Sequence, residues 1–406
     1  MAKINLIEDD PIVLSALAAK ISQTPFEKGD IFSLYEEIKS NKDKAKNLVN
    51  QIMKKGHLIF GDFLSYAIVL EDISRFAAIY LWRNVNVHNL VFGAGIEASF
   101  RVVKPNRFKE ELEFLGQEIF EIYEKALQAE IPEQDARYLL PEGVLTRMIF
   151  FAPPRYLSKL ASDFKNKPLS ELQEIGEKIE SLIKERFGFE IPEEKLPSQW
   201  QFWGEKKNKE TDYFNYEGNI HSLSLKMEIK GSLAMYAQLV RQRQLLVDLE
   251  PLERIARRGK FVVPLSFNRE IREAYREIAK RSKQKQLELL EKKDPNFVYF
   301  LLLGQEAKSV IYGSGVGVIE TSRSRSEGVA QWEIRNVVGI PITEELARYR
   351  ELRNEIGPRC WREKRCIEPA TFRRLCPAFK KTSGVWQDDL ESLLQILKEK
   401  YKTFII

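Results

Sequence analysis

The sequence predicts an α+β protein with two tandem domains, each a small antiparallel sheet packed with long helices. The chain has 406 residues, enough for two or three domains. Short apolar runs alternate with longer segments that have helical spacing. The same order of runs occurs before and after a polar stretch near the middle. We therefore expect a first domain over 1–197, a linker over 198–215 and a second domain over 216–406.

Composition is that of a soluble globular protein. Hydrophobic residues make up 44% of the chain, aromatic residues 11% and charged residues 30%, so full cores can form. We find no uncharged apolar run near the roughly 18 residues of a membrane span, so no membrane association is expected. The N-terminus lacks the basic-then-apolar layout of a signal peptide. We therefore expect a cytoplasmic protein.

Charge and cysteine content exclude two further classes. The net charge is +5, and acidic residues are interleaved with basic ones, as in the segment 269–293. That pattern is typical of a solvated helix, so we expect no nucleic-acid partner. Three cysteines lie close together (Cys360, Cys366 and Cys376), and the chain has three histidines. We interpret the cysteines as reduced thiols and expect no metal site.

The first half predicts its elements in this order. We expect a helix over 33–55 with a break at 41–44, a strand over 63–70 and a helix over 72–82. A strongly amphipathic helix follows over 110–129 and ends at Ile131-Pro132. The apolar segment 136–151 is expected to be helical up to Pro153-Pro154.

The second half predicts the same plan. We expect a strand over 223–229, a helix over 233–246, a short apolar stop over 261–264, a long charged helix over 269–292 and an apolar segment over 298–310. Residues 70–85 align by eye with residues 229–243, each as a strand that runs into a helix with a basic end. An internal duplication that has diverged explains this repeat.

Three groups of residues could bind an anion. Gln238 and Arg241 are three residues apart and share a helix face, whereas Arg243 lies about 200° further around the axis from Arg241. Arginine suits phosphate because its fork donates two parallel hydrogen bonds. One helix end could thus contact two bound molecules, although a solvated basic helix end would have the same pattern.

The second group is the arginine cluster Arg323, Arg325 and Arg335. We expect Ser324 or Ser326 to cap a helix that begins near residue 327, which would place the arginines at its positive end and favour a phosphate. A surface loop with salt bridges is the alternative.

Two single residues form the third group. Arg137 opens an apolar segment, and His57 follows a helix; each could contact a ligand or simply mark a helix end. The glycines of the segment 313–317 do not follow a clear strand–turn–helix unit, so we expect no dinucleotide fingerprint. No Ser–His–Asp or Cys–His constellation is recognisable.

Several of these segments together resemble the flavin-dependent thymidylate synthases. Arg325 is followed at the family's spacing by Ala330-Gln331-Trp332-Glu333-Ile334-Arg335, and Gln238-Leu-Val-Arg241-Gln242-Arg243 is similar to its central motif Gln-x-x-Arg-His-Arg. The first half resembles the family at four places, namely residues 18–22, Lys55-Gly56-His57, Ile73-Ser74-Arg75 with Arg83, and Ala136-Arg137-Tyr138-Leu139-Leu140-Pro141. The fold implied is two tandem domains of the thymidylate-synthase-complementing-protein type.

Each half departs from the family pattern at different positions. In the first half, Tyr80 stands in place of glutamine and Phe164 in place of the late arginine. In the second half, Val298 stands near the position of Arg137, and Leu246, Asp248 and Pro251 replace the family's Ser-x-Asn-Glu-x-Ser-x-Arg segment. The losses are complementary, so the two halves could share one complete set of ligand residues. Independent decay of both halves would give a similar picture.

The resemblance implies reductive methylation of dUMP to dTMP, with FAD as cofactor and with NADPH and methylenetetrahydrofolate as co-substrates. It places Gln238, Arg241, Arg325 and Arg137 on the nucleotide, with Arg325 at the base as the catalytic residue, and Arg243, Arg241, His57 and Arg83 on the flavin. A homodimer of this chain would mimic the family's homotetramer. The alternatives are a non-catalytic paralogue that keeps the fold and a ligand, and a flavin enzyme acting on another pyrimidine nucleotide.

Overall fold

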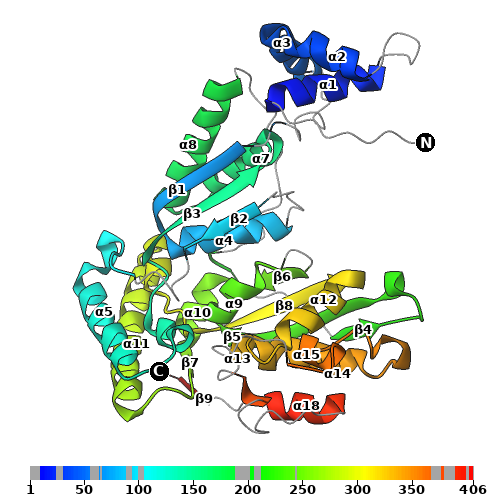
Figure 1. The fold of residues 1–406 in the computed structure, drawn as a ribbon. Coiled ribbons are helices and arrows are strands. Elements are labelled where there is room, and N and C mark those ends of the chain that lie inside the picture. Colours follow the sequence, from blue (N-terminus) through cyan, green and yellow to red (C-terminus); the bar gives the residue numbers. More distant parts are fainter. Residues whose placement is uncertain are drawn as a thin grey trace. The chain divides into compact units, whose positions relative to one another are not determined.

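The computed structural model describes residues 10–23, 31–54, 64, 66–87, 94–98, 105–187, 202–204, 212–242, 245–366, 376–378, 389–398 and 402–405. The chain forms two compact units (Figure 1). Unit 1 comprises residues 1–71, 88–97 and 147–198, and unit 2 comprises residues 72–87, 98–146 and 199–406. Each unit is discontinuous in sequence. The expected division at 1–197, 198–215 and 216–406 is a different partition and stays a prediction.

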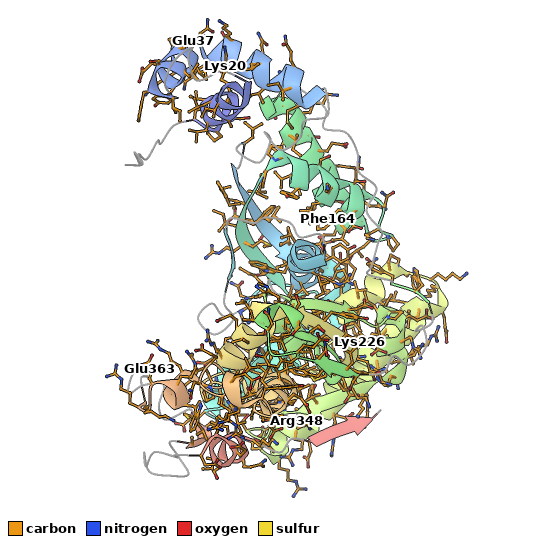
Figure 2. The ribbon with its side chains drawn as sticks, turned by 90° about the vertical axis from the view of Figure 1, so that its right-hand side faces the viewer. Lys20, Glu37, Phe164, Lys226, Arg348 and Glu363 are labelled. Carbon is orange, nitrogen blue, oxygen red and sulfur yellow. The ribbon has the colours of Figure 1, made fainter. Side chains whose placement is uncertain are left out.

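Helices make up most of the described part of unit 1. The helices α1 (Pro11–Gln23), α2 (Ile31–Lys39) and α3 (Lys42–Lys54) pack against one another, and α7 (Pro154–Lys165) packs against α8 (Ser170–Phe187). Lys20 lies 3.7 Å from Glu37 and links α1 to α2 (Figure 2). Asn41 Oδ1 accepts a hydrogen bond from Lys44 N (3.0 Å), which caps α3. The structure thus has a break in the predicted helix, but at residues 40 and 41 rather than over 41–44, because Lys42 already begins α3.

A three-stranded sheet contains residues of both units and has the order β1-β3-β2. Its strands are β1 (Tyr66–Ser74), β2 (Ala94–Glu97) and β3 (Leu145–Ala152). The expected helix over 136–151 is wrong, because β3 alternates buried residues such as Met148 with exposed ones such as Ile149. That period of two suits a sheet face, and β2 supplies the antiparallel partner.

The following helix also begins later than predicted. β1 continues through Ser74, and α4 covers Arg75–Val87 rather than 72–82. Ser74 Oγ accepts from Ala77 N (3.0 Å), so this serine ends the strand and caps the helix.

Unit 2 contains a second sheet with the order β4-β5-β8-β6, antiparallel throughout. Its strands are β4 (Tyr213–Asn215), β5 (Ser224–Ser232), β6 (Leu245–Leu249) and β8 (Glu306–Ser314). The helix predicted over 233–246 is wrong in its second part. α9 covers only Leu233–Leu239, and β6 alternates buried Leu245, Val247 and Leu249 with exposed residues while pairing with β8.

The two long helices of unit 2 lie side by side (Figure 1). α5 covers Glu113–Gln128 and α11 covers Arg269–Glu291, which confirms both amphipathic predictions. Their buried faces belong to one apolar core that includes Leu115, Tyr138, Phe261, Tyr275 and Trp332. Residues from both sequence halves therefore share a single core.

Shorter elements complete unit 2. They are η3 (Glu110–Leu112), α6 (Glu133–Ala136), η4 (Arg137–Leu139), η5 (Ile220–Ser222), α10 (Leu252–Arg258), β7 (Lys260–Val263), η6 (Pro295–Phe300), α12 (Gly315–Arg325), α13 (Trp332–Ile334), the π-helix η7 (Arg335–Gly339), α14 (Ile340–Leu346), η8 (Arg350–Leu352), α15 (Arg359–Arg362), α18 (Leu390–Leu397) and β9 (Lys402–Ile405). Of the helices described, none combines the length and apolar character needed to cross a bilayer.

Two turns of unit 2, at 138–143 and 299–304, exchange backbone hydrogen bonds reciprocally. Each bond has a counterpart in which the two turns swap the roles of donor and acceptor. The bonds run from Glu142 N to Leu301 O (2.8 Å), from Leu303 N to Leu140 O (2.8 Å), from Gly143 N to Tyr299 O (3.0 Å) and from Gly304 N to Tyr138 O (3.0 Å). Pro141 and Leu302 form a bridge between the same turns.

The helices that follow β1 and β5 begin in the same way. Arg75 N and Phe76 N donate to the carbonyls of Val144 and Glu142, while Leu233 N and Ala234 N donate to those of Gln305 and Leu303. Ser232 Oγ accepts from Met235 N (3.0 Å), as Ser74 does in the first half. The two strand–helix junctions thus share one pattern of hydrogen bonds.

The glycines of the two turns are required by this close approach. A Cβ at Gly143 would lie 2.9 Å from Tyr299 Cβ, and a Cβ at Gly304 would lie 3.0 Å from Tyr138 O and closer still to the Tyr275 hydroxyl. We expect Gly143→Ala and Gly304→Ala each to lower the free energy of unfolding by about 1–3 kcal/mol, measured by chemical denaturation. Unchanged unfolding midpoints would show that the turns can separate without cost.

Candidate functional site

The arginines of the segment 323–335 differ in their partners. Arg323 and Arg325 lie in the last turn of α12. The expected helix beginning near residue 327, with these arginines at its positive end, is therefore wrong, because α12 ends where that helix was expected to begin. A helix C-terminus carries a negative partial charge and favours the cations there. From the sequence we also recognised no clear strand and helix around the glycines of 313–317. The structure has both, because β8 runs directly into α12 at Gly315.

Arg323 and Arg335 are satisfied by the protein itself. Arg323 Nη1 donates to Glu320 (2.6 Å), and its Nη2 donates to Glu355. Arg335 is 2% exposed, and its guanidinium donates to three backbone carbonyls. These carbonyls are Leu397 O (3.1 Å), Gly328 O (2.9 Å) and Ala330 O (2.7 Å). Arg335 thus holds the 328–330 loop against α18.

Arg325 is the exception. The Gln242 amide, oriented with its oxygen toward Arg325, accepts from the guanidinium Nε and Nη2. No carboxylate of the described part of the chain pairs with this guanidinium. Burial, followed by the nearby positive charge of Arg241, lowers the pKa of Arg325 to about 10. A largely buried cation without a countercharge is costly, and an anionic ligand would relieve that cost.

Arg241 lies just past α9 and faces an aromatic ring. Its guanidinium carbon is 5.7 Å from the centroid of the Trp82 ring. Arg83, the next residue of α4, is 4% exposed and approaches Asp248 of β6 at 3.5 Å. These contacts join α4 of the first sequence half to residues 241–248 of the second, all within unit 2. They hold the guanidinium group of Arg241 beside Trp82 and that of Arg83 beside Asp248.

Gln238, on the last turn of α9, has a buried amide nitrogen. Its Nε2 has no hydrogen-bond partner in the described chain. Such a donor is normally satisfied, so it points to a missing acceptor. We call Gln238, Arg241, Gln242 and Arg325 the arginine–glutamine cluster. It offers cationic and amide donors and suits an acceptor-rich anion.

The remaining predicted residues fall into two groups. Arg137 begins η4, and its Nε donates to Gln134 O (3.0 Å). Its positive charge acts on Tyr123 and Glu333. His57 and Arg243 lie outside the described residues, so their predicted contacts with flavin stay predictions.

The signature Gln331-Trp332-Glu333 forms a buried polar network that we did not expect from the sequence. Trp332 Nε1 donates to Asp135 (2.8 Å), and Gln331 Nε2 donates to the Tyr138 hydroxyl (2.6 Å). Glu333 is 0% exposed and accepts from Tyr138 (2.5 Å). Burial raises the pKa of Glu333, and its hydrogen bonds oppose that shift. The sequence signal for this network was the run Gln331-Trp332-Glu333 itself. Each of these side chains carries a polar group that needs a hydrogen-bond partner when it is buried.

The comparisons with known proteins point to one family. Residues 5–187 match the model of the thymidylate synthase complementing protein family. A flavin-dependent thymidylate synthase of Sulfurisphaera tokodaii is 37% identical over 92 residues, which cover 21% of this chain and 36% of that protein. The corresponding protein of Saccharolobus solfataricus is 28% identical over 146 residues, which cover 33% and 53%. Residues 5–187 therefore resemble the thymidylate synthase complementing protein family, and the matches span about a third and about half of the two relatives.

Two solved structures resemble part of the chain. One is the flavin-dependent thymidylate synthase ThyX of Helicobacter pylori complexed with FAD and dUMP, at 18% identity over 42% of this chain and 88% of that one, with a TM-score of 0.33. The other is the UMP/dUMP methylase PolB of Streptomyces cacaoi bound with 5-Br dUMP, at 14% identity over 43% and 85%, with a TM-score of 0.32. TM-scores this low carry no further conclusion.

The buried charge of Arg325 leads to a prediction about the free energy of unfolding. Its folded-state pKa lies below the unfolded one, so the charged form destabilises the fold below about pH 10, and this penalty fades as pH rises above that value. We expect Arg325→Met to raise the unfolding free energy of the ligand-free protein at pH 7 by about 1–3 kcal/mol. Differential scanning calorimetry measures this.

Arg323→Met is the matched control, two residues earlier on α12. It removes a guanidinium that Glu320 and Glu355 satisfy, so it should leave stability unchanged or lower it. Destabilisation by both substitutions would contradict an uncompensated charge at Arg325.

Proposed function

We propose that this protein is an FAD-dependent thymidylate synthase that converts dUMP to dTMP, with methylenetetrahydrofolate and NADPH as co-substrates. The observation that carries the proposal is Arg325, a largely buried guanidinium beside Arg241 with no carboxylate partner in the described chain. The match of residues 5–187 to the thymidylate synthase complementing protein family supports the same reaction. The protein's contribution is to position the reactants and to stabilise negative charge.

The arginine–glutamine cluster would bind the nucleotide. Arg241 and Gln238 donate to its phosphate and sugar oxygens, and Arg325 faces the pyrimidine base, where a guanidinium stabilises negative charge that develops during methylation. Arg137 contributes a further cation from the first sequence half. The low pKa of Arg325 would rise toward its ordinary value once an anion binds, because the new countercharge favours the charged form.

The described residues also fit a flavin. The guanidinium groups of Arg83 and Arg241 are suited to the phosphates of FAD. Arg243 and His57 complete the flavin-binding set that we propose. When bound, the flavin supplies hydride. The residues named here hold and orient it.

The chain, in this proposal, consists of two tandem copies over 1–197 and 216–406 that arose by duplication. The reciprocal bonds between the turns at 138–143 and 299–304 support it, and so does the shared strand order of β1-β3-β2 and β5-β8-β6. The counterparts of Gln238, Arg325 and Arg137 would be Tyr80, Phe164 and Val298, all at most 1% exposed (Phe164 is labelled in Figure 2). One ligand set per chain would then remain, and a homodimer would correspond to the family's tetramer.

A second candidate is a non-catalytic paralogue that binds nucleotide or flavin. Asp248 favours it, because this carboxylate stands in the segment that departs from the family pattern and approaches Arg83, a residue that we assign to the flavin. Flavin content and turnover separate the two candidates.

Purified protein is expected to carry oxidised flavin, visible by absorbance, and to release dTMP when supplied with dUMP, methylenetetrahydrofolate and NADPH. Arg241→Gln should weaken dUMP binding about tenfold or more in calorimetric titration, because a hydrogen bond to a charged group contributes roughly 1.5–3 kcal/mol. Arg348→Gln, which removes an exposed ion pair with Glu345, is the control and should leave the affinity unchanged.

Flavin and dUMP binding without dTMP formation would support the paralogue. Protein that takes up neither flavin nor dUMP would contradict both candidates. Growth of a thymidine-requiring bacterium on this gene gives an independent measure of turnover.

A further inference from the structure

The turn that carries Arg137 is anchored on both sides by three consecutive residues of the signature. Asp135 and Tyr138 flank Arg137, and each is buried. Trp332 binds the Asp135 carboxylate, whose second oxygen accepts from Ser266 (2.6 Å). The Tyr138 ring stacks on the Trp332 ring with centroids 6.1 Å apart and an interplanar angle of 21°. The position of Arg137 thus depends on residues nearly two hundred positions later in the chain.

Glu333 is the hub of this anchor. Its Oε1 accepts from Ser232 N (2.7 Å), and its Oε2 accepts from the hydroxyls of Tyr138 (2.5 Å) and Ser232. All three residues are buried in unit 2. The carboxylate therefore links β5, η4 and α13 at one point.

Obligate donors occupy one acceptor site on each of the two hydroxyls. Met235 N donates to Ser232 Oγ (3.0 Å), and Gln331 Nε2 donates to Tyr138 Oη (2.6 Å). Each hydroxyl keeps its own hydrogen as a donor for Glu333. A carboxylate with three donors is well satisfied as an anion, and the positive charge of Arg137 favours that anion.

From this geometry we infer that Glu333 is a positioning residue for Arg137, with Tyr138 and Ser232 as the groups through which it acts. The Glu333 carboxyl group locks the 133–139 turn through its bonds with Tyr138 and Ser232, and so fixes the backbone from which the Arg137 side chain projects. Arg137 is then presented from a fixed turn to the ligand that Arg325 also contacts. The inference rests on the proposed function for the placement of Arg137 at the ligand and for the identity of that ligand.

Nucleotide affinity tests whether Glu333 acts through Arg137. With dUMP as the probe and the full chain with its flavin, Arg137→Gln and Glu333→Gln should each weaken binding about tenfold, and the double variant should bind no more weakly than Arg137→Gln alone. Tyr138→Phe keeps the ring but removes one donor, and should weaken binding by a smaller factor. Wild-type affinity in Glu333→Gln, or losses that multiply in the double variant, would overturn the inference.

Hydrogen exchange measures the turn without any ligand. The amides of residues 133–140 should exchange at least about tenfold faster in Glu333→Gln and in Tyr138→Phe than in the wild type. Glu250→Gln is the control, because it neutralises another buried carboxylate, which accepts from Arg258 (2.8 Å), and should leave these amides protected.

The two measurements separate the inference from the proposed function. If the wild-type protein binds no dUMP, the proposed function fails, and exchange alone decides the role of Glu333. Faster exchange confined to 133–140 in Glu333→Gln would then support it. Unchanged exchange, or equally fast exchange in Glu250→Gln, would overturn it.

Discussion

The reciprocal hydrogen bonds between the turns at 138–143 and 299–304 are the constraint on which the rest of unit 2 depends. Buried backbone groups must pair, and these two turns satisfy each other's donors and acceptors. The pairing places the first-half residues Arg83 and Tyr138 against Asp248 and Glu333 of the second half. Neither half could build these contacts alone, so the candidate site is a product of both halves of the sequence.

Electrostatics distinguishes three arginines that the sequence presents as one cluster. Arg323 is neutralised by carboxylates, and Arg335 is satisfied by backbone carbonyls. Arg325 has an amide partner and a neighbouring positive charge, so no carboxylate of the described chain neutralises it. This contrast, rather than the number of basic residues, identifies the binding site that we propose.

Sequence reasoning succeeded where one element decides its own structure. The helices at 113–128 and 269–291 are long and have one apolar face, so their periodicity predicted them. It failed at 145–152 and 245–249, where short apolar runs become strands because β2 and β8 are available as partners. Within the site, motif spacing singled out Arg325 and Arg241. The contacts of Gln242 with Arg325 and of Asp248 with Arg83 were not predictable, because both residues depart from the family pattern.

By itself the sequence determined the α+β class, the long helices, the family resemblance and the residue types able to bind an anion. Those properties follow from local periodicity and from motif spacing, which a linear chain carries directly. Only the tertiary structure decided which arginine keeps an unneutralised charge and that Glu333 sits between Tyr138 and Ser232. Burial and partner choice depend on groups distant in sequence, and their energies exist only once the chain has brought those groups together.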